Sequence, residues 1–350
     1  MSATPSPGPP AAAGSHPVPD APPALVMVAH GSRSAASEEE MEALRAEVAA
    51  ALPGVDVRLG YLEMSLPSAG TVIDGLAGAG CRRAVVLPVI LLAGGHGKSD
   101  VPAVVLAAQA RHPQLELSLG NPLGISSDLV AILGARVLDA GAGGLPLLLI
   151  GRGTSDPDAN GDAHKVARLV AEWTGASFVH TAFTGVTTPM VAEGLDVFAR
   201  LGHDRLAVAF WFLADGLLVQ RARSDIAEFR RRRGVEVVDV GYLGPDVRVA
   251  QRVVQRYREA IEGTTSVNCD TCAYRAPWPG IEERAGAAIG VGHSALAAAH
   301  RHATVHPDGG AGGGSQASHH AGDHDHADHD RTEGADHGHA DYDGAERRQW

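Results

Sequence analysis

Short, almost continuous apolar runs alternate with longer stretches of mixed polarity along the first half of the chain. The apolar runs predict strands at residues 24–29, 55–62, 83–88 and 114–119, because runs of this length rich in Val, Leu, Ile and Ala are typical of buried strands. The stretches that follow them predict helices at residues 37–51, 68–78, 100–112 and 127–140. Strands and helices that alternate in this way indicate an α/β fold with a parallel, doubly wound sheet.

The same pattern starts again after a glycine-rich linker at residues 141–144. The second half predicts strands at residues 146–150, 177–183, 205–211 and 235–240, and helices at residues 160–173, 188–201, 220–232 and 246–262. The halves align at a shift of 122 residues, which places Ala29-His30-Gly31-Ser32 on Gly151-Arg152-Gly153-Thr154 and Pro67 on Pro189. We therefore expect an internal duplication, with two similar lobes at residues 24–141 and 145–263.

Segments of biased composition flank the two lobes. Residues 1–23 consist largely of Pro, Ala, Ser and Gly, without the basic start or apolar core of an export signal, and predict a disordered tail. A Cys-x-x-Cys segment follows the second lobe at residues 264–291, and residues 292–350 form a low-complexity tail that we also expect to be disordered.

Composition narrows the class of protein. The chain is 45% hydrophobic but only 4% aromatic, so its cores must be aliphatic. The net charge of −12 includes ten Asp and Glu against three Arg from Pro307 onward, and no part carries the basic field of a nucleic-acid-binding protein. No apolar run approaches the roughly 20 residues of a membrane span. Three cysteines make no disulfide framework, so we expect a cytoplasmic protein.

Candidate chemistry lies just beyond three strands of the first half. His30, Glu63 and His96 each follow the carboxyl end of a predicted strand, where α/β proteins bind ligands. Two imidazoles and a carboxylate at one sheet edge form a metal-ligand or acid/base set. A histidine after a strand is more often structural, so the interpretation rests on all three residues.

The second half lacks this set, because its corresponding places hold Arg152, Gly185 and, near the third, Leu217. We infer that the first half carries the chemistry and that the second half closes the cleft. Gly97-Lys98-Ser99 is not a phosphate loop, since the glycine required five residues before Gly97 is Leu92.

Three motifs of the first half match a known family in the family's order. They are VAHGSR at residues 28–33, YLEMSLPS at residues 61–68 and LPVILLAGGHGKSDVP at residues 87–102. The sequence resembles the class II metal chelatases of the sirohydrochlorin type, which comprise cobaltochelatases and ferrochelatases, and its second half resembles the degenerate repeat of the long, two-lobed members. The resemblance implies insertion of a divalent ion into a polycarboxylated tetrapyrrole, sirohydrochlorin, without ATP.

The resemblance also implies roles for individual residues. His30 would be the proton acceptor and a metal ligand, His96 the second ligand, and Glu63 an accessory acid. Many relatives have an acidic residue directly before the motif proline, where this chain has Leu66, so Glu63 is the carboxylate that remains in the motif. The predicted substrate-binding residues are Ser32, Arg33, Leu91, Leu92, Ala93, Gly94, Gly95, Lys98 and Ser99.

The sequence leaves open the identity of the metal ion and the oligomeric state. Imidazole binds cobalt, iron and nickel without excessive affinity, so Co²⁺ and Fe²⁺ both fit as co-substrate. Cobalt is favoured because the histidine-rich tail and the Cys-x-x-Cys resemble cobalamin-pathway members, with siroheme synthesis as the other destination. A metal-binding or delivery protein on a non-catalytic chelatase scaffold is the alternative function. The chain is expected to be a monomer or a homodimer.

Cys269 and Cys272 form a lone Cys-x-x-Cys pair. Two thiolates supply half of the four ligands that an iron-sulfur cluster needs. A cluster completed by other donors, a zinc site with two histidines, a redox pair and an uncommitted thiol pair all remain open.

Eleven of the eighteen histidines lie from His293 onward, and many of them alternate with Asp. Such a tract cannot bury a core, but it can hold several borderline ions weakly. We predict a metal reservoir, with a merely solubilising tail as the alternative. Its candidate ligands are His319, His320, His324, His326, His329, His337 and His339.

Truncation at Gly292 tests the tail. We expect the shortened protein to keep its insertion rate at saturating metal, because the predicted ligands His30 and His96 are retained, and to lose rate only when metal is scarce. The measurement is the tetrapyrrole metallation rate over a metal titration, and loss of activity at saturating metal would contradict the assignment.

Overall fold

The computed structural model describes residues 21–263. The predictions for residues 1–20, for the segment holding Cys269 and Cys272, and for the histidine-rich tail at residues 292–350 lie outside the described residues. The first half contains β1 (Ala24–Ala29), α1 (Ala35–Ala51), β2 (Val57–Tyr61), α2 (Ala69–Gly78), β3 (Arg83–Pro88), η1 (His96–Asp100), α3 (Val101–Arg111), β4 (Glu116–Leu119) and α4 (Ser127–Asp139). The second half contains β5 (Leu147–Gly151), α5 (Pro157–Thr174), β6 (Val179–Phe183), α6 (Val191–Arg200), β7 (Arg205–Phe210), α7 (Leu217–Arg233), β8 (Glu236–Tyr242) and α8 (Val247–Glu262).

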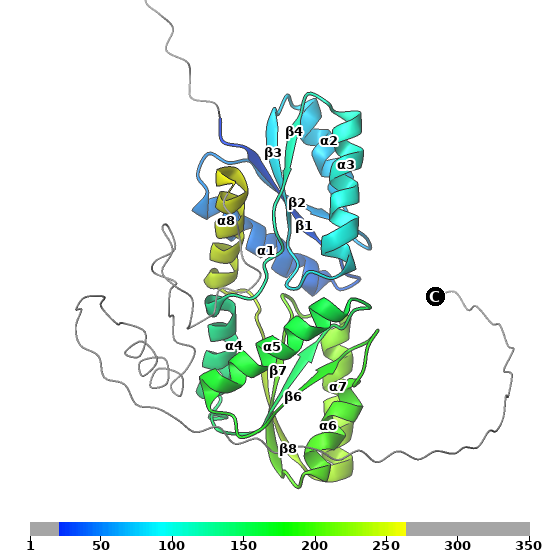
Figure 1. The fold of residues 1–350 in the computed structure, drawn as a ribbon, viewed down its shortest axis with the longest axis vertical. Coiled ribbons are helices and arrows are strands. Elements are labelled where there is room, and N and C mark those ends of the chain that lie inside the picture. Colours follow the sequence, from blue (N-terminus) through cyan, green and yellow to red (C-terminus); the bar gives the residue numbers. More distant parts are fainter. Residues whose placement is uncertain (1–20, 264–350) are drawn as a thin grey trace, which may run out of the picture. The chain divides into compact units, whose positions relative to one another are not determined.

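Each half builds one four-stranded parallel sheet (Figure 1). The strand order is β2-β1-β3-β4 in the first sheet and β6-β5-β7-β8 in the second. Leu25 of the central strand β1 pairs with Val57 of β2 on one side and with Val85 of β3 on the other. The expected α/β class with two similar, doubly wound lobes is confirmed.

The unbroken apolar character of the strands follows from burial on both faces. All six residues of β1 are buried. Leu25, Met27 and Ala29 belong to the largest core cluster, whereas Val26 and Val28 belong to the core beneath α2 and α3. Because successive side chains of a strand point to opposite faces, neither face leaves room for a polar position.

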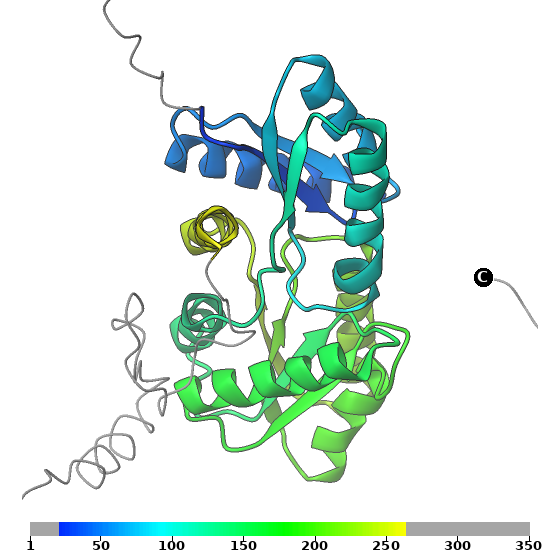
Figure 2. The ribbon, with the colours of Figure 1, turned by 45° about the horizontal axis from the view of Figure 1, so that its top comes forward.

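The last helix of each half packs on the other half. Helix α8 contacts helix α1 and strands β3 and β4 of the first half. Helix α4 contacts helix α5 and strands β7 and β8 of the second half. The two exchanged helices also contact each other, and α8 lies directly above α4 in Figure 1; Figure 2 shows the same helices after a 45° turn. The boundary between residues 141 and 145 therefore separates the sequence repeats but not the packed units.

Buried arginines anchor one of the exchanged helices. Arg252 Nε and Arg256 Nη2 of α8 donate to the carbonyl oxygen of Leu123 at 2.7 and 3.1 Å. The largest core cluster holds Leu25 of the first sheet and Leu147 of the second, together with Leu129 of α4 and Val253 of α8. One continuous core thus runs through both lobes.

The duplication extends to backbone detail at the expected shift. Gly31 and Gly153 both have positive φ, as do Met64 and Val186, and cis peptide bonds precede Pro67 and Pro189. Isolated bridges pair Tyr61 with Ser68 and Phe183 with Met190. In each case the two positions differ by 122 residues, so the repeats share the turns that follow their first two strands.

Element boundaries differ from the expected ones where local capping was overlooked. Helix α5 begins at Pro157 rather than at residue 160, because the Asp156 side chain accepts from the backbone N–H of Asp158 and a proline fits the first helical position. The helix expected from Asp100 is preceded by the wide turn η1, which starts at His96. His96 is thus the first residue of a helical segment.

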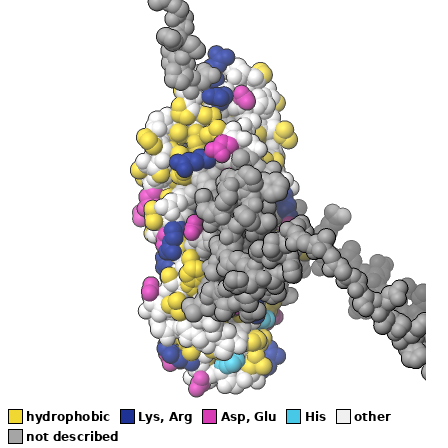
Figure 3. Space-filling view, turned by 60° about the vertical axis from the view of Figure 1, so that its left-hand side comes forward, with side chains coloured by type: hydrophobic (Ala, Val, Ile, Leu, Met, Phe, Trp, Pro, Cys, Tyr) yellow, Lys and Arg dark blue, Asp and Glu magenta, His cyan; other side chains and the backbone are white. Residues whose placement is uncertain are grey.

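None of the helices within residues 21–263 is both long and apolar enough to cross a membrane. On the part of the surface visible in Figure 3, basic and acidic side chains lie interspersed with apolar ones.

Gly153→Ala tests the shared turn. A Cβ there would lie 2.1 Å from the carbonyl oxygen of Gly185, on a backbone with φ of +81°. We expect destabilisation well above the roughly 1–2 kcal/mol of a left-handed alanine alone, measured by urea unfolding. Gly202→Ala is the matched control, because Gly202 has φ of +79° with nothing within 4 Å of the added carbon. Equal losses in the two variants would show that the close approach costs nothing.

Candidate metal centre

Three neighbouring strands bring the predicted triad together. His30 follows the central strand β1, Glu63 follows β2, and His96 opens η1 after β3. Since parallel strands end at the same sheet edge, side chains distant in sequence meet there.

A tight backbone contact holds two of these strand ends. The Glu63 N–H donates to the carbonyl oxygen of His30 at 3.0 Å. A Cβ on Gly31 would lie 1.7 Å from the carbonyl oxygen of Glu63, and Gly31 has φ of +98°. Only glycine satisfies both conditions, so Gly31 is a requirement of the turn that presents the imidazole of His30.

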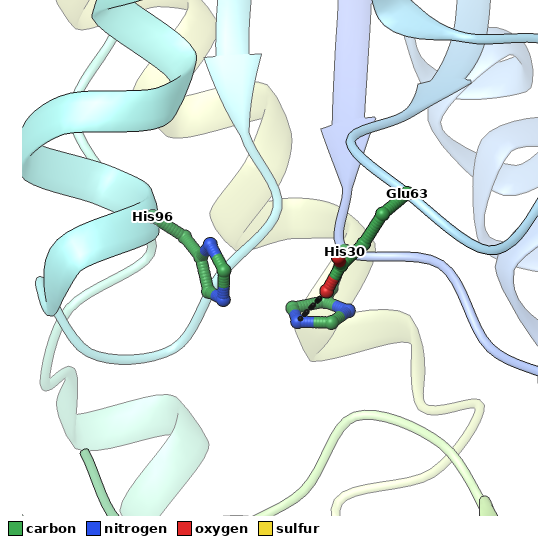
Figure 4. A group of neighbouring side chains, drawn as sticks. All are labelled: His30, Glu63 and His96. Carbon is green, nitrogen blue, oxygen red and sulfur yellow. Dashed lines mark ion pairs between the residues drawn. The ribbon is translucent and has the colours of Figure 1, made fainter. Parts of the chain in front are cut away.

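The three side chains converge on a small volume (Figure 4). His30 Nε2 lies 3.0 Å from Glu63 Oε1, and the rings of His30 and His96 stand edge to face with centroids 4.5 Å apart. One ligand atom from each of the three residues lies within 4.8 Å of the others. Metal bonds to these atoms are about 2.0–2.2 Å long, so modest side-chain rotations suffice for all three to reach one ion.

Asp100 orients His96. Its Oδ2 atom lies 2.6 Å from His96 Nδ1, one helical turn away. A carboxylate on one ring nitrogen leaves the other free for a metal, as is usual for ligating histidines. The sequence motif contained Asp100, but its spacing of four residues from His96 was the signal that the sequence analysis overlooked.

The environment of His30 favours the neutral imidazole. Burial lowers its pKa below the ordinary 6.5, and the Arg152 guanidinium and His96 lower it further. The Gly31 carbonyl and Glu63 act in the opposite direction without reversing the shift. A neutral imidazole can bind a metal ion or accept a proton at physiological pH.

A cavity of about 600 Å³ opens beside the triad and is lined by both lobes. Six of the nine predicted substrate-binding residues line it, namely Ser32, Arg33, Leu91, Leu92, Gly94 and Gly95. Ala93, Lys98 and Ser99 are not among the lining residues in the described part of the chain, so their contacts with substrate stay predictions.

Lys98, which was predicted to bind substrate, forms ion pairs with two aspartates of the second half. Its ammonium group lies 2.7 Å from Asp156 and 2.9 Å from Asp158. Both aspartates belong to the start of α5 in the second half. In this structure Lys98 therefore links the two repeats.

The second half lines the cavity mostly with apolar groups, which include Trp211, Phe212, Leu213, Leu217 and Leu218. Leu218 lies 122 residues beyond His96, so a leucine occupies the place of the second imidazole. The expectation that the second half closes the cleft agrees with this lining. The alignment of the two repeats could have predicted that this part of the cavity lining is apolar.

Arg152 is the functional candidate that the sequence analysis set aside. It was excluded because a guanidinium does not bind metal, yet its Nη2 atom lies 2.8 Å from His30 Nε2. The repeat alignment placed Arg152 opposite His30 in sequence, but it contained no information that the two side chains meet.

Comparison with known proteins agrees with this architecture. The family model, the similar relatives and the similar solved structures identify this two-lobed protein as a class II metal chelatase family member. The sequence model of the CbiX family matches residues 24–140 and 146–260, one match to each repeat. The chain belongs to the CbiX family.

Individual relatives are similar over most of their length. The chain is 32% identical to the sirohydrochlorin cobaltochelatase of Priestia megaterium over 222 residues, covering 61% of this chain and 72% of the relative. It is 27% identical to the sirohydrochlorin ferrochelatase of Bacillus subtilis, covering 67% and 91%. The solved structure of SirB from Bacillus subtilis with Fe³⁺ superposes with a TM-score of 0.61 at 26% identity, covering 69% of this chain and 98% of that one.

The protonation of His30 can be measured in the metal-free protein. Because its pKa is lowered, we expect the neutral form to persist below pH 6.5 and to be lost only as the pH falls through the lowered value. Arg152→Gln should raise the pKa towards 6.5 without reaching it, since burial, the larger cause, remains. NMR titration of the ring protons gives both values, with His30→Gln identifying the resonance. A wild-type midpoint at or above 6.5 would contradict this account.

Proposed function

We propose that the protein is a sirohydrochlorin chelatase that inserts a divalent metal ion into the macrocycle without ATP. The observation that carries the proposal is the convergence of two imidazoles and a carboxylate within 4.8 Å beside an apolar cavity of about 600 Å³. Donor groups of this type bind borderline divalent ions, and cavities of about 300–1,000 Å³ hold small ligands. The names of the relatives supply the substrate.

The cavity suits a flat ring with charged edges. Leu91 and Leu92 of the first half and Phe212 and Leu213 of the second half are among the lining residues, and apolar groups of this kind pack on the faces of a macrocycle. Arg33 also lines the cavity and is available to a carboxylate at the ring edge.

Metallation requires removal of two pyrrole protons while the ion is transferred. Neutral His30 accepts one of these protons after the ion has left it, and its lowered pKa keeps it in the competent form. The second proton passes to the Glu63 carboxylate, which lies 3.0 Å from His30, or to solvent. His96, oriented by Asp100, presents the ion. Imidazole releases a borderline ion more readily than a thiolate does, which suits an ion that must be handed over.

We propose cobalt as the physiological metal, with iron next. The triad accepts both ions, and the similar relatives include a cobaltochelatase and a ferrochelatase. The preference for cobalt, and hence for cobalamin rather than siroheme synthesis, rests on the histidine-rich tail and the Cys-x-x-Cys. Cys269 and Cys272 lie beyond residues 146–260 matched by the family, and we assign them no cofactor.

A metallation assay with anaerobic sirohydrochlorin tests the function. We expect His30→Ala and His96→Ala each to lower kcat by roughly 100-fold or more, because each removes a metal ligand and His30 also serves as general base. Glu63→Gln should cost less, about tenfold, since half of its side chain stays exposed to solvent. The absorbance change on metal insertion is followed with Co²⁺, Fe²⁺ and Ni²⁺ in parallel.

His112→Ala is the matched control. His112 belongs to the same half and pairs with Asp74 at 2.7 Å, away from the residues that line the cavity. Its variant should retain wild-type turnover. A wild-type protein that binds metal without metallating sirohydrochlorin would instead be a metal carrier on a chelatase scaffold.

A further inference from the structure

One nitrogen of His30 has two partners of opposite charge. Its Nε2 atom lies 2.8 Å from Nη2 of Arg152 and 3.0 Å from Oε1 of Glu63. A hydrogen bond from Nε2 to Glu63 would place the ring proton on Nε2. A guanidinium has only donors, so a hydrogen bond from Arg152 requires instead a lone pair on Nε2 and the proton on Nδ1, which lies 3.2 Å from the carbonyl oxygen of Gly31.

The Arg152 guanidinium lies beside His30 as a bound metal cation would. The lone pair of His30 and the carboxylate of Glu63 are the groups that a divalent ion would engage. In the structure, the Arg152 guanidinium is the positively charged group that contacts His30 Nε2, at 2.8 Å. Arg152 and an ion therefore compete for the same nitrogen.

The duplicated fold explains why Arg152 reaches this position. Arg152 is the counterpart of His30 in the second repeat, and Gly153 forms the same positive-φ turn behind it as Gly31 forms behind His30. The side chains meet where the repeats face each other.

Neighbouring contacts are reciprocal in the same way. The position of a Cβ on Gly94 lies 3.0 Å from Thr154 Oγ1, and that of a Cβ on Gly216 lies 3.6 Å from Ser32 Oγ. Gly216 is the counterpart of Gly94, and Thr154 is the counterpart of Ser32. Reciprocal contacts are the mark of a two-fold interface, here within one chain, and residues 30 and 152 lie opposite each other across it.

Arg152 also faces the substrate cavity. Together with His30 and His96 it is among the lining residues, and part of its side chain is exposed. Rotation of a flexible side chain is enough to move the guanidinium from His30 to a ligand in the cavity. Guanidinium groups bind carboxylates by paired, charge-assisted hydrogen bonds, which are stronger than a single bond to a neutral imidazole.

We propose that Arg152 occupies the cation position of the triad in the substrate-free protein and transfers to a carboxylate of the tetrapyrrole when the macrocycle enters. This inference rests on the proposed function, which supplies the polycarboxylate. Arg152 then acts as a gate, by which we mean that its position controls the affinity of the triad for the ion. The ion binds weakly to the substrate-free protein and more tightly once a carboxylate of the macrocycle holds the guanidinium. Coupling of this kind is reciprocal, so bound metal favours the ring by the same factor.

Binding measurements on the full-length protein test the gate, with Co²⁺ and uroporphyrin, a stable octacarboxylate porphyrin, titrated separately. Co²⁺ bound outside the triad, including by the histidine-rich tail, is subtracted with a His30→Ala/His96→Ala double variant titrated in parallel. Arg152→Leu removes the competing cation and should tighten Co²⁺ binding about tenfold, equivalent to about 1.4 kcal/mol. The same variant loses a carboxylate partner and should bind uroporphyrin about tenfold more weakly. Arg152→Lys keeps the charge without the forked donor and should fall between Arg152→Leu and the wild type for both ligands.

Arg221→Leu is the control for general electrostatics. Arg221 also lines the cavity from the second half, and its removal changes the net charge by the same amount. It is expected to alter Co²⁺ affinity by less than twofold, because no contact between Arg221 and His30 is found among the described residues.

Opposite effects on the two ligands are the signature of the gate. Weaker binding of both ligands by Arg152→Leu would mean that Arg152 only maintains the fold of the site, and unchanged Co²⁺ affinity would mean that it does not compete for His30. Either result overturns the inference. A wild-type protein that binds no uroporphyrin and metallates no sirohydrochlorin would contradict the proposed function instead, while the Co²⁺ comparison would still report whether Arg152 competes with the ion.

Discussion

The exchange of terminal helices is the constraint on which the site depends. Helix α4 packs on the second sheet and α8 on the first, and a single apolar core runs between them. Separating the repeats would therefore expose the apolar side chains of that core to water, which is strongly unfavourable in free energy. Because the core fixes how the sheet edges face each other, it also determines that residue 152 of one repeat lies against residue 30 of the other.

The two repeats share backbone turns but carry different side chains at them. Both retain the glycine turn after the first strand, which the close approach of two backbones requires. The side chains at the corresponding strand ends differ. The first repeat offers two imidazoles and a glutamate, whereas the second offers a guanidinium and apolar side chains. The cavity is therefore asymmetric: the triad belongs to the first repeat, whereas the lining residues come from both repeats.

Electrostatic balance at His30 links these roles. Burial and the neighbouring guanidinium keep the imidazole neutral, while Glu63 and the Gly31 carbonyl partly offset them. A histidine that is neutral but surrounded by mobile charges can hold an ion, lose it and accept a proton. Asp100 gives His96 a fixed partner, so the two imidazoles differ in how firmly they are oriented.

The sequence by itself determined the α/β class, the strands, the duplication and the triad, because these depend on local periodicity and on a strand order that brings His30, Glu63 and His96 to one edge. It placed the start of α5 three residues late, because an Asp-Pro cap begins that helix, and it did not predict the turn η1 ahead of α3. Only the tertiary structure decided that α4 and α8 change places, that Lys98 pairs with Asp156 and Asp158, and that Arg152 reaches His30. These contacts join residues far apart in the chain, and no spacing along a sequence encodes which surfaces two lobes present to each other.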